Sequence, residues 1–288
     1  MKIIKGIAVF VFFGVFLSAC FNPPEFSVTP SIEFEGKQFV RGKSASDADT
    51  LIISLNFKDG DGDLGLEGTQ IDSPFHANYF YLADNGVKTR IITFPADIAD
   101  ESGVQSISIL DIPAGATGKL VNASTRKQTG DTSFPVYQDP FTCTAYVRDS
   151  VYVLERDLGY LDMSKLIRTI NTQPKIYVFR DTLYYETNPL HYNIDVEFLV
   201  KQADNSFQVY DIKKELCNNG LSGDGFFGRF PVLSDSENPL EGVLTYKMNS
   251  AGFRFIFGSK RLKLRIRIRD RALHESNTIT TDEFGLND

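Results

Sequence analysis

The sequence predicts an all-β chain: an immunoglobulin-like antiparallel β-sandwich with a long insertion or a small second β-subdomain. Apolar and polar residues alternate in several segments, most clearly over residues 262–269. This period of two is typical of a strand with one face in the core and one in water. Clusters of Gly, Asn and Asp, as at residues 84–86 and 218–220, separate such segments, and helical periodicity is scarce. Short strands divided by turn residues are typical of a sandwich.

The alternating segments at the two ends of the chain predict parts of one sandwich. An early strand is expected over residues 51–57, and later strands over residues 191–200, 243–248, 253–257, 261–269 and 277–284. Residues 253–257 belong to this set because Phe253, Phe255 and Phe257 occupy alternate positions. A short helix is expected over residues 163–170, and a single helical turn over residues 211–216.

The middle of the chain carries further strand-like segments, at residues 91–94, 106–110, 147–154 and 175–179. We interpret the region of about residues 75–185 as an insertion into the sandwich, with a small second β-subdomain as the alternative. The expected organisation is a signal peptide over residues 1–19, a lipidated cysteine and tether over residues 20–30, and a β-sandwich domain with this elaboration over residues 31–288.

The N-terminus has the features of a bacterial export signal. Lys2 and Lys5 precede an apolar run over residues 7–17, which is shorter than the roughly 20 residues of a membrane-spanning helix. The Leu-Ser-Ala-Cys sequence at residues 17–20 resembles the lipobox of lipoprotein signals. The resemblance implies cleavage before Cys20 and acylation of that residue, which would anchor the protein to a membrane. An ordinary cleaved signal is the alternative.

Charge and cysteine content limit the possible partners. The formal net charge is −7, and loss of Lys2 and Lys5 with the signal makes the chain more acidic. Non-specific nucleic-acid binding depends on Lys and Arg that neutralise phosphates, so no nucleic-acid partner is expected. After lipidation of Cys20, Cys143 and Cys217 remain. Export permits a disulfide between them, and two buried free thiols are the alternative.

An acidic, glycine-rich loop follows the first expected strand. Asp59, Asp61 and Asp63 alternate with glycines over residues 59–65. Carboxylates at this spacing repel one another unless a cation lies among them, and Ca²⁺ prefers 6–8 oxygen ligands. An EF-hand is excluded because, counting from Asp59, position six is Leu64 and position twelve is Gln70. We therefore predict a calcium-binding loop on a sandwich. A solvated turn is the alternative.

A second loop strengthens this hypothesis. Residues 269–277 join the last two expected strands. In an immunoglobulin-like sandwich this hairpin lies at the same end as the loop after the second strand. Asp270 is therefore expected to reach the acidic loop as a further metal ligand, with Glu275 or Asn277 as a neighbour.

The two loop sequences, DGDGDLG at residues 59–65 and IRDRALHESN at residues 268–277, together resemble surface or periplasmic lipoproteins of the Bacteroidota type. The resemblance covers roughly residues 45–70 and 190–285. It implies an immunoglobulin-like fold and a lipid-anchored location at the outer membrane, facing the periplasm or the cell surface. It carries over no enzymatic role.

Two other patterns have structural explanations. The strand over residues 260–269 carries a row of Lys and Arg, which either contacts a polyanion or pairs with Asp195 and Glu197 on a neighbouring strand. We favour the pairing, because opposite charges across strands stabilise a sheet. Residues 223–228 spell GxGxxG, but Arg-Phe-Pro follows instead of a helix, so we predict a loop rather than a dinucleotide site.

No residue pattern names a reaction. The histidines, His76, His191 and His274, show no zinc spacing, and no GxSxG motif is present. The favoured interpretation is a non-catalytic binding or assembly module of the cell envelope with a structural calcium ion. The alternative is a surface glycan-capture protein or glycan-acting enzyme with its site in residues 75–185, where the aromatic residues 79–81 and 184–185 lie. Expected partners are the membrane through the lipid anchor, and an envelope protein or a glycan.

Overall fold

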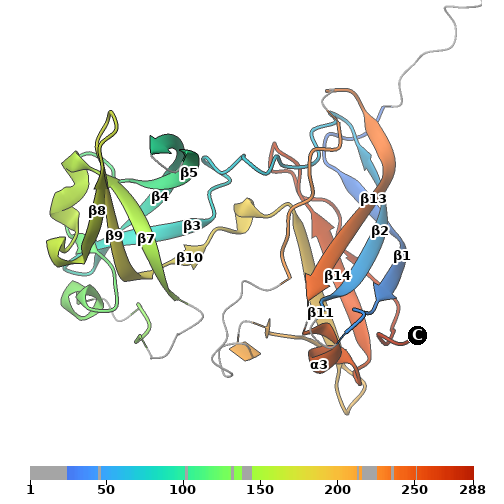
Figure 1. Cartoon of the computed structure of the whole chain (residues 1–288). Helices are drawn as coiled ribbons and strands as arrows, with labels where there is room; N and C mark the ends of the chain where they lie inside the picture. Colours follow the sequence, from blue (N-terminus) through green and yellow to red (C-terminus); the bar gives the residue numbers. More distant parts are fainter. Residues whose placement is uncertain are drawn as a thin grey trace, which may run out of the picture.

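The computed structural model describes residues 25–288 except 45–46, 101–102, 131–132, 138–144, 213, 216–225, 235–236 and 251. Strands dominate and form two lobes joined by two chain crossings (Figure 1). The predicted all-β class is confirmed. Cys20, Cys143 and Cys217, on which the lipidation and disulfide hypotheses depend, lie outside the described residues.

The first lobe is a sandwich of two antiparallel sheets. One sheet has the order β1-β2-β13, with β1 (Ser31–Val40), β2 (Asp49–Asp59) and β13 (Leu240–Ser250). The other has the order β12-β11-β14-β15, with β12 (Phe207–Val209), β11 (Ile194–Lys201), β14 (Leu262–Ile268) and β15 (Ile279–Thr280). The two sheets, of three and four strands, form the β-sandwich that the sequence predicted.

The sandwich core follows directly from the alternation. Along β2, β11 and β14, every second residue is buried and its neighbours are partly exposed or exposed. The buried faces of the two sheets meet in one hydrophobic cluster that includes Leu51, Ile53, Leu55, Val196, Phe198, Leu264 and Ile266. Each fully buried side chain of this size contributes roughly 1.5–3 kcal/mol to stability. The pattern that predicts the strands is thus also the pattern that forms the core.

Residues 253–257 are a short α-helix, α3 (Phe253–Phe257), so the strand predicted there is wrong. Phe253 and Phe257 are 1% and 0% exposed, whereas Phe255 is 93% exposed. A helix places positions i and i+4 on one face, while a strand would have turned all three rings to the same side. The core accepts two of the rings: Phe257 stacks on Phe198, with ring centroids 4.7 Å apart. Arg254 of the helix also pairs with buried Asp49 of β2 at 2.8 Å.

The second lobe is a mixed sheet inserted between β2 and β11. Its strands are β3 (Asn78–Asp84), β4 (Val87–Asp100), β5 (Gly103–Asp111), β6 (Lys119–Leu120), β7 (Tyr146–Leu154), β8 (Leu166–Ile170), β9 (Ile176–Tyr184) and β10 (Glu186–Thr187). The order is β10-β3-β4-β5-β7-β9-β8, with β6 beside β3 and with β5 and β7 parallel. Phe80, Leu82, Val153 and Phe179 belong to its own core. The region is therefore an insertion in the chain and a β lobe with a separate core.

Short helical segments occur mainly in this lobe. They are the 3₁₀-helices η1 (Thr125–Thr129), η2 (Glu155–Tyr160), η3 (Met163–Lys165) and, beside the lobe junction, η4 (Pro189–His191). The helix predicted over residues 163–170 is wrong beyond η3, because Ile167, Thr169 and Ile170 belong to β8, where β-branched residues are favoured. The helical turn predicted over residues 211–216 is confirmed for its described part, where Glu215 N–H donates to the Asp211 carbonyl.

The two chain crossings between the lobes hold each other in place. Buried Asn188 on the returning crossing donates from Nδ2 to the carbonyl oxygens of Pro74 and His76, both at 2.7 Å, on the outgoing crossing. Arg229 donates to the carbonyl oxygens of Glu67 and Gln70. The outgoing crossing is thus fixed to the sandwich directly after the acidic loop.

The aromatic cluster around α3 gives a first test. Phe257→Ala is expected to lower the free energy of unfolding by about 3–5 kcal/mol, because it removes a fully buried ring. Phe255→Ala, in the same helix, should change it by less than about 0.5 kcal/mol. Urea titrations followed by circular dichroism would measure both. Similar losses for the two variants would show that the rings are equivalent, as in a strand.

Candidate metal centre

The acidic loop leaves the end of β2 and turns between two backbone segments. A Cβ at Gly60 would lie 2.5 Å from the carbonyl oxygen of Phe26, so no side chain fits there. Gly65 has a φ of +99°, and a Cβ on it would collide with the backbone of Pro231. Glycine alone tolerates both the close approach and the left-handed backbone. The loop is therefore packed tightly between the N-terminal segment and residues 230–233.

Backbone contacts join the acidic loop to the loop that follows β14. Leu64 and Asp270 form an antiparallel bridge. The Asp63 carbonyl accepts from Arg271 N–H at 3.3 Å, and Asp63 Oδ2 accepts from Ala272 N–H at 2.9 Å. Loops on opposite sheets of the sandwich are thereby held together at one end, which we call the acidic pole (residues 59–65 and 269–277).

The acidic pole brings together the four residues that the sequence analysis proposed as ligands. Asp59, Asp61, Asp63 and Asp270 each offer one carboxylate oxygen, and these oxygens all lie within 4.8 Å of one another. Asp59 is 0% exposed and Asp270 is 1% exposed. Four carboxylates this close, two of them fully buried, would repel one another strongly in the absence of a cation.

Several of these oxygens lack any partner among the described residues. Both oxygens of Asp59, together with Oδ1 of Asp61 and Oδ1 of Asp63, are buried without a hydrogen bond. A buried ionised group without a partner costs several kcal/mol. Asp270 differs, because it accepts from His274 N–H at 2.7 Å and lies 2.9 Å from His274 Nδ1. Buried oxygens without a partner, in residues whose carboxylates lie this close together, are typical of a cation site.

The electrostatics of the pole agree with its geometry. Burial, followed by the charges of Asp61, Asp63 and Asp270, raises the pKa of Asp59 to about 6. Burial is also the main cause that raises the pKa of Asp63 and of Asp270. The hydrogen bond that His274 donates to Asp270 raises the pKa of His274 in turn. A divalent cation would reverse this repulsion and hold all four carboxylates ionised.

The predicted neighbours Glu275 and Asn277 have other roles. Glu275 pairs with Arg267 at 2.6 Å and with Arg269 at 2.7 Å. Asn277 accepts from the Ile32 N–H and donates to the Ile32 carbonyl, which ties β1 to the acidic pole. In the part of the chain that the structure describes, the carboxylate cluster consists of Asp59, Asp61, Asp63 and Asp270, without Glu275.

His274 is a neighbour of the carboxylate cluster that the sequence analysis did not identify. Its ring orients Asp270, as a residue behind a metal ligand commonly does. The spacing of a carboxylate and a histidine four residues apart in one loop was the available signal. His76 and His191 lie elsewhere, at the lobe junction, where His191 Nδ1 is 2.8 Å from the Phe75 carbonyl.

The donor set defines the class of ligand that fits. All four candidate ligands offer hard carboxylate oxygens, and the nearest imidazole is already engaged with Asp270. Such a set suits Ca²⁺ or Mg²⁺ rather than zinc, which prefers Cys and His.

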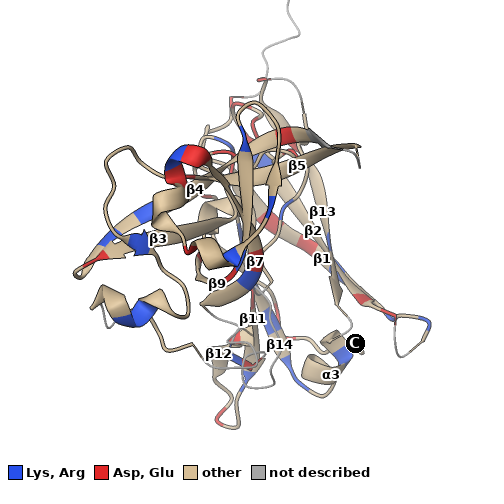
Figure 2. Ribbon diagram, turned by 60° about the vertical axis from the view of Figure 1, so that its left-hand side comes forward, with Lys and Arg blue, Asp and Glu red and all other residues tan. Residues whose placement is uncertain are grey.

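The basic strand has the structural explanation that the sequence favoured. Arg265 pairs with Glu197, and Arg267 pairs with Asp195 at 2.8 Å, each directly across the β11–β14 ladder. The pairing prediction is confirmed. More widely, acidic and basic residues are interspersed over both lobes in the view of Figure 2.

The GxGxxG match is not a nucleotide site in its described part. Gly228 forms an isolated bridge with Ile194, and residues 226–228 open no helix. A Cβ on Gly228 would collide with the ring of Tyr246, which explains the glycine. Residues 223–225 lie outside the described residues.

The aromatic residues considered as glycan platforms in the second lobe are largely buried. Tyr81 and Tyr184 are 5% and 7% exposed and pack around Phe134. Both hydroxyls hydrogen-bond to Glu186. These rings form core rather than an exposed platform.

Comparisons of the chain with protein-family models, with characterised proteins and with solved structures found no match. Among the described residues, none of the helices is both long and apolar enough to cross a membrane. The fold and the site define the class of protein: a two-sheet β-sandwich with an inserted β lobe and a carboxylate cluster at one pole.

The raised pKa of Asp59 predicts an unusual pH dependence in EDTA. A carboxyl group whose pKa is 3.8 when unfolded and about 6 when folded binds its proton more tightly in the folded state. The free energy of unfolding should therefore fall as pH rises between these values, and the full penalty should persist above about pH 6. Urea titrations across this range should show a flatter dependence for Asp59→Asn.

Asp72→Asn serves as the control, because Asp72 is exposed and lies outside the cluster. It should keep the wild-type slope. An equally steep decline in Asp59→Asn would show that Asp59 is not the group that titrates.

Proposed function

We propose that this protein is a lipid-anchored module of the cell envelope, non-catalytic, that binds or assembles other envelope components and carries a structural calcium ion at its acidic pole. The observation that carries the proposal is the convergence of Asp59, Asp61, Asp63 and Asp270, with buried oxygens that no described residue satisfies.

Calcium fits this pole better than magnesium on chemical grounds. Ca²⁺ takes 6–8 oxygens in flexible geometry, whereas Mg²⁺ demands near-ideal octahedral geometry and keeps several waters. The four carboxylates come from an irregular loop and from a second loop on the opposite sheet. Loop carbonyls and water would complete the shell. Calcium sites of extracellular modules have dissociation constants of roughly 10⁻⁴–10⁻³ M.

A structural role follows from what the ion would hold together. Asp59 is the last residue of β2, Asp61 and Asp63 follow it, and Asp270 follows β14 on the other sheet. An ion bound only by the folded state stabilises that state, by about 2.7 kcal/mol at a concentration a hundred times its dissociation constant. Calcium would therefore fasten the two sheets at one end and order the loops that a partner meets.

The proposed anchor would hold this pole near the membrane. Cys20 precedes the described residues by only a few positions, and residues 25–30 lead into β1 beside the acidic loop. The Lys58 ammonium lies 5.5 Å from the centre of the Phe26 ring. If Cys20 is acylated, as the lipobox resemblance implies, the acidic pole would face the outer membrane from the periplasm or the cell surface.

A second candidate function is a glycan-capture protein or glycan-acting enzyme with its site in residues 75–185. A pocket of about 280 Å³ in this lobe favours it, because polar residues line it, among them Asn122, Lys165 and Asp181. Asn122 Nδ2 donates to Asp181 Oδ2 at 2.7 Å, and the Tyr160 hydroxyl donates to the Ala116 carbonyl at 2.8 Å. The pocket therefore offers polar side chains to the hydroxyls of a small ligand such as a single sugar unit.

Thermal unfolding tests the calcium site. The unlipidated chain with Cys20→Ser should melt at a higher temperature in millimolar Ca²⁺ than in EDTA, and Mg²⁺ should have a smaller effect. Asp61→Asn should remove most of the calcium-induced rise, because it weakens one ligand, whereas Asp72→Asn should keep it. An equal rise with Mg²⁺ would contradict calcium selectivity, and no rise with either ion would end the metal proposal.

Membrane fractionation tests the anchor. Wild-type protein expressed in a bacterial host should appear in the membrane fraction and be released by detergent. Cys20→Ser, on the same signal, should move to the soluble fraction, because the acyl chains provide the attachment. Retention of Cys20→Ser in the membrane fraction would contradict the lipid-anchor hypothesis.

A further inference from the structure

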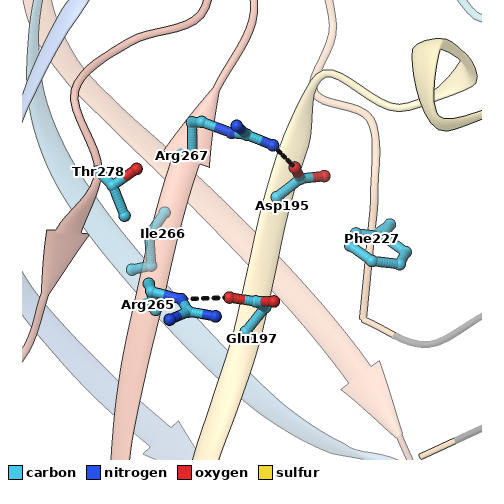
Figure 3. Close-up of a pocket in the computed structure, with 7 residues that line it drawn as sticks. All are labelled: Asp195, Glu197, Phe227, Arg265, Ile266, Arg267 and Thr278. Atoms are coloured by element: carbon cyan, nitrogen blue, oxygen red, sulfur yellow. Dashed lines mark hydrogen bonds and ion pairs between the residues drawn. The ribbon is translucent and has the colours of Figure 1, made fainter. Parts of the chain in front are cut away.

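A second pocket lies on the sandwich, away from the core. It has a volume of about 390 Å³ and sits on the outer face of the β11–β14 pair (Figure 3). Asp195 and Glu197 of β11, with Arg265 and Arg267 of β14, form its floor. These residues alternate with buried ones along both strands, so their side chains point outward. The volume falls within the range of roughly 300–1,000 Å³ typical of small-molecule sites.

The sheet register explains why an aromatic ring borders this floor. Gly228 pairs with Ile194, so Phe227 lies across from Asp195 on the same, outer face. Phe226, one position earlier, turns the opposite way, and its ring centroid is 4.3 Å from that of Phe198 in the core. Phe227 remains 39% exposed at the edge of the pocket.

The charges of the four floor residues cancel, but their side chains keep unused hydrogen-bond donors and acceptors. Each arginine faces one carboxylate, so the four floor residues have no net charge. A guanidinium has five N–H donors. Among the described residues, Arg265 uses one in its bond to Glu197, and Arg267 uses two, for Asp195 and Glu275. The remaining donors lie along β14 and the carboxylate lone pairs lie along β11, so the pocket floor presents a row of donors beside a row of acceptors (Figure 3).

These features select one chemical class of ligand. A charged ligand gains little from a neutral floor, and an apolar ligand would leave its donors and acceptors unpaired. A sugar ring carries neighbouring hydroxyls that both donate and accept, and it has an apolar C–H face. The two ion pairs do not explain why Phe227 lies beside the floor. Exposed ion pairs contribute only about 0–1 kcal/mol, and they need no aromatic neighbour.

We infer that this pocket binds a neutral saccharide unit, whose hydroxyls bond to the Arg265–Glu197 and Arg267–Asp195 pairs and whose C–H face stacks on Phe227. The inference goes beyond the calcium proposal and does not depend on it. It also differs from the glycan alternative above, because it places the sugar on the sandwich rather than in the inserted lobe.

The test is calorimetric titration of the whole mature chain in detergent with short neutral gluco-, manno-, galacto- and xylo-oligosaccharides. At least one should bind. Phe227→Ala should weaken that binding about tenfold, which corresponds to about 1.4 kcal/mol, and Phe227→Tyr should retain it. Phe255→Ala is the matched control, since it removes a ring that is 93% exposed on α3 and outside the pocket.

A charge variant makes the test independent of any folding defect in Phe227→Ala. Glu197→Gln keeps the shape of the floor and an acceptor for Arg265, but it gives the floor a net positive charge. Binding of the neutral sugar should weaken, and an acidic oligosaccharide such as an oligogalacturonate should gain affinity relative to wild type.

Three outcomes would overturn the inference. They are no binding of any neutral oligosaccharide, equal effects of Phe227→Ala and Phe255→Ala on a sugar that does bind, and binding of acidic sugars alone by the wild type.

The titrations are also run in Ca²⁺ and in EDTA, and with Asp61→Asn, to separate the sugar site from the calcium site. Asp61 lies outside the pocket, so a failed calcium site and a failed sugar site give different results.

Discussion

Repulsion among four carboxylates at the acidic pole is the constraint around which this end of the sandwich is organised. The topology forces them together, because the ends of β2 and β14 lie at the same pole and Leu64 bridges Asp270. Other segments converge on the same place. The N-terminal segment crosses Gly60, β1 is tied in by Asn277, and residues 230–233 run beside the loop, with Leu233 N–H bonded to the Leu64 carbonyl. Such convergence around uncompensated negative charge has a simple physical explanation if a cation completes it.

The sandwich contains charged residues in two different environments, one with paired charges and one with unpaired charges. On the outer face of β11 and β14, each arginine meets a carboxylate across the ladder, and the side chains stay partly exposed. At the acidic pole, Asp59 is fully buried and both of its oxygens lack a partner among the described residues. The first arrangement is complete in itself and offers only its unused hydrogen-bonding groups to a ligand. The second is incomplete, and that difference is what separates a structural ion-pair ladder from a candidate cation site.

The inserted lobe leaves this organisation intact because of where the chain departs and returns. It departs just after the acidic loop and returns just before β11, and Asn188 fastens the two crossings to each other. The lobe has its own core and brings its own polar pocket. Two candidate binding surfaces and one candidate metal centre therefore occupy different parts of one chain. Under the function proposed above, such separation would allow the protein to meet more than one partner.

Alternation in the sequence determined most of the sandwich, since strict burial of every second residue in β2, β11 and β14 leaves few other structures possible. The Asp and Gly residues at positions 59–65 predicted the acidic loop. The sandwich topology was then enough to predict that Asp270 lies close to this loop. Other features depended on tertiary structure. The alternation in β1 is interrupted by a register shift between Phe34 and Gly36, so the strand was not recognised. The spacing of the phenylalanines in α3 is compatible with a strand or with a helix. The helix is favoured by two tertiary contacts, the stacking of Phe257 on Phe198 and the ion pair of Arg254 with Asp49. Exposure of Phe227 likewise follows from a bridge between Gly228 and Ile194, which no local pattern contains. Local periodicity encodes which side of an element is buried, whereas packing against distant residues decides the rest.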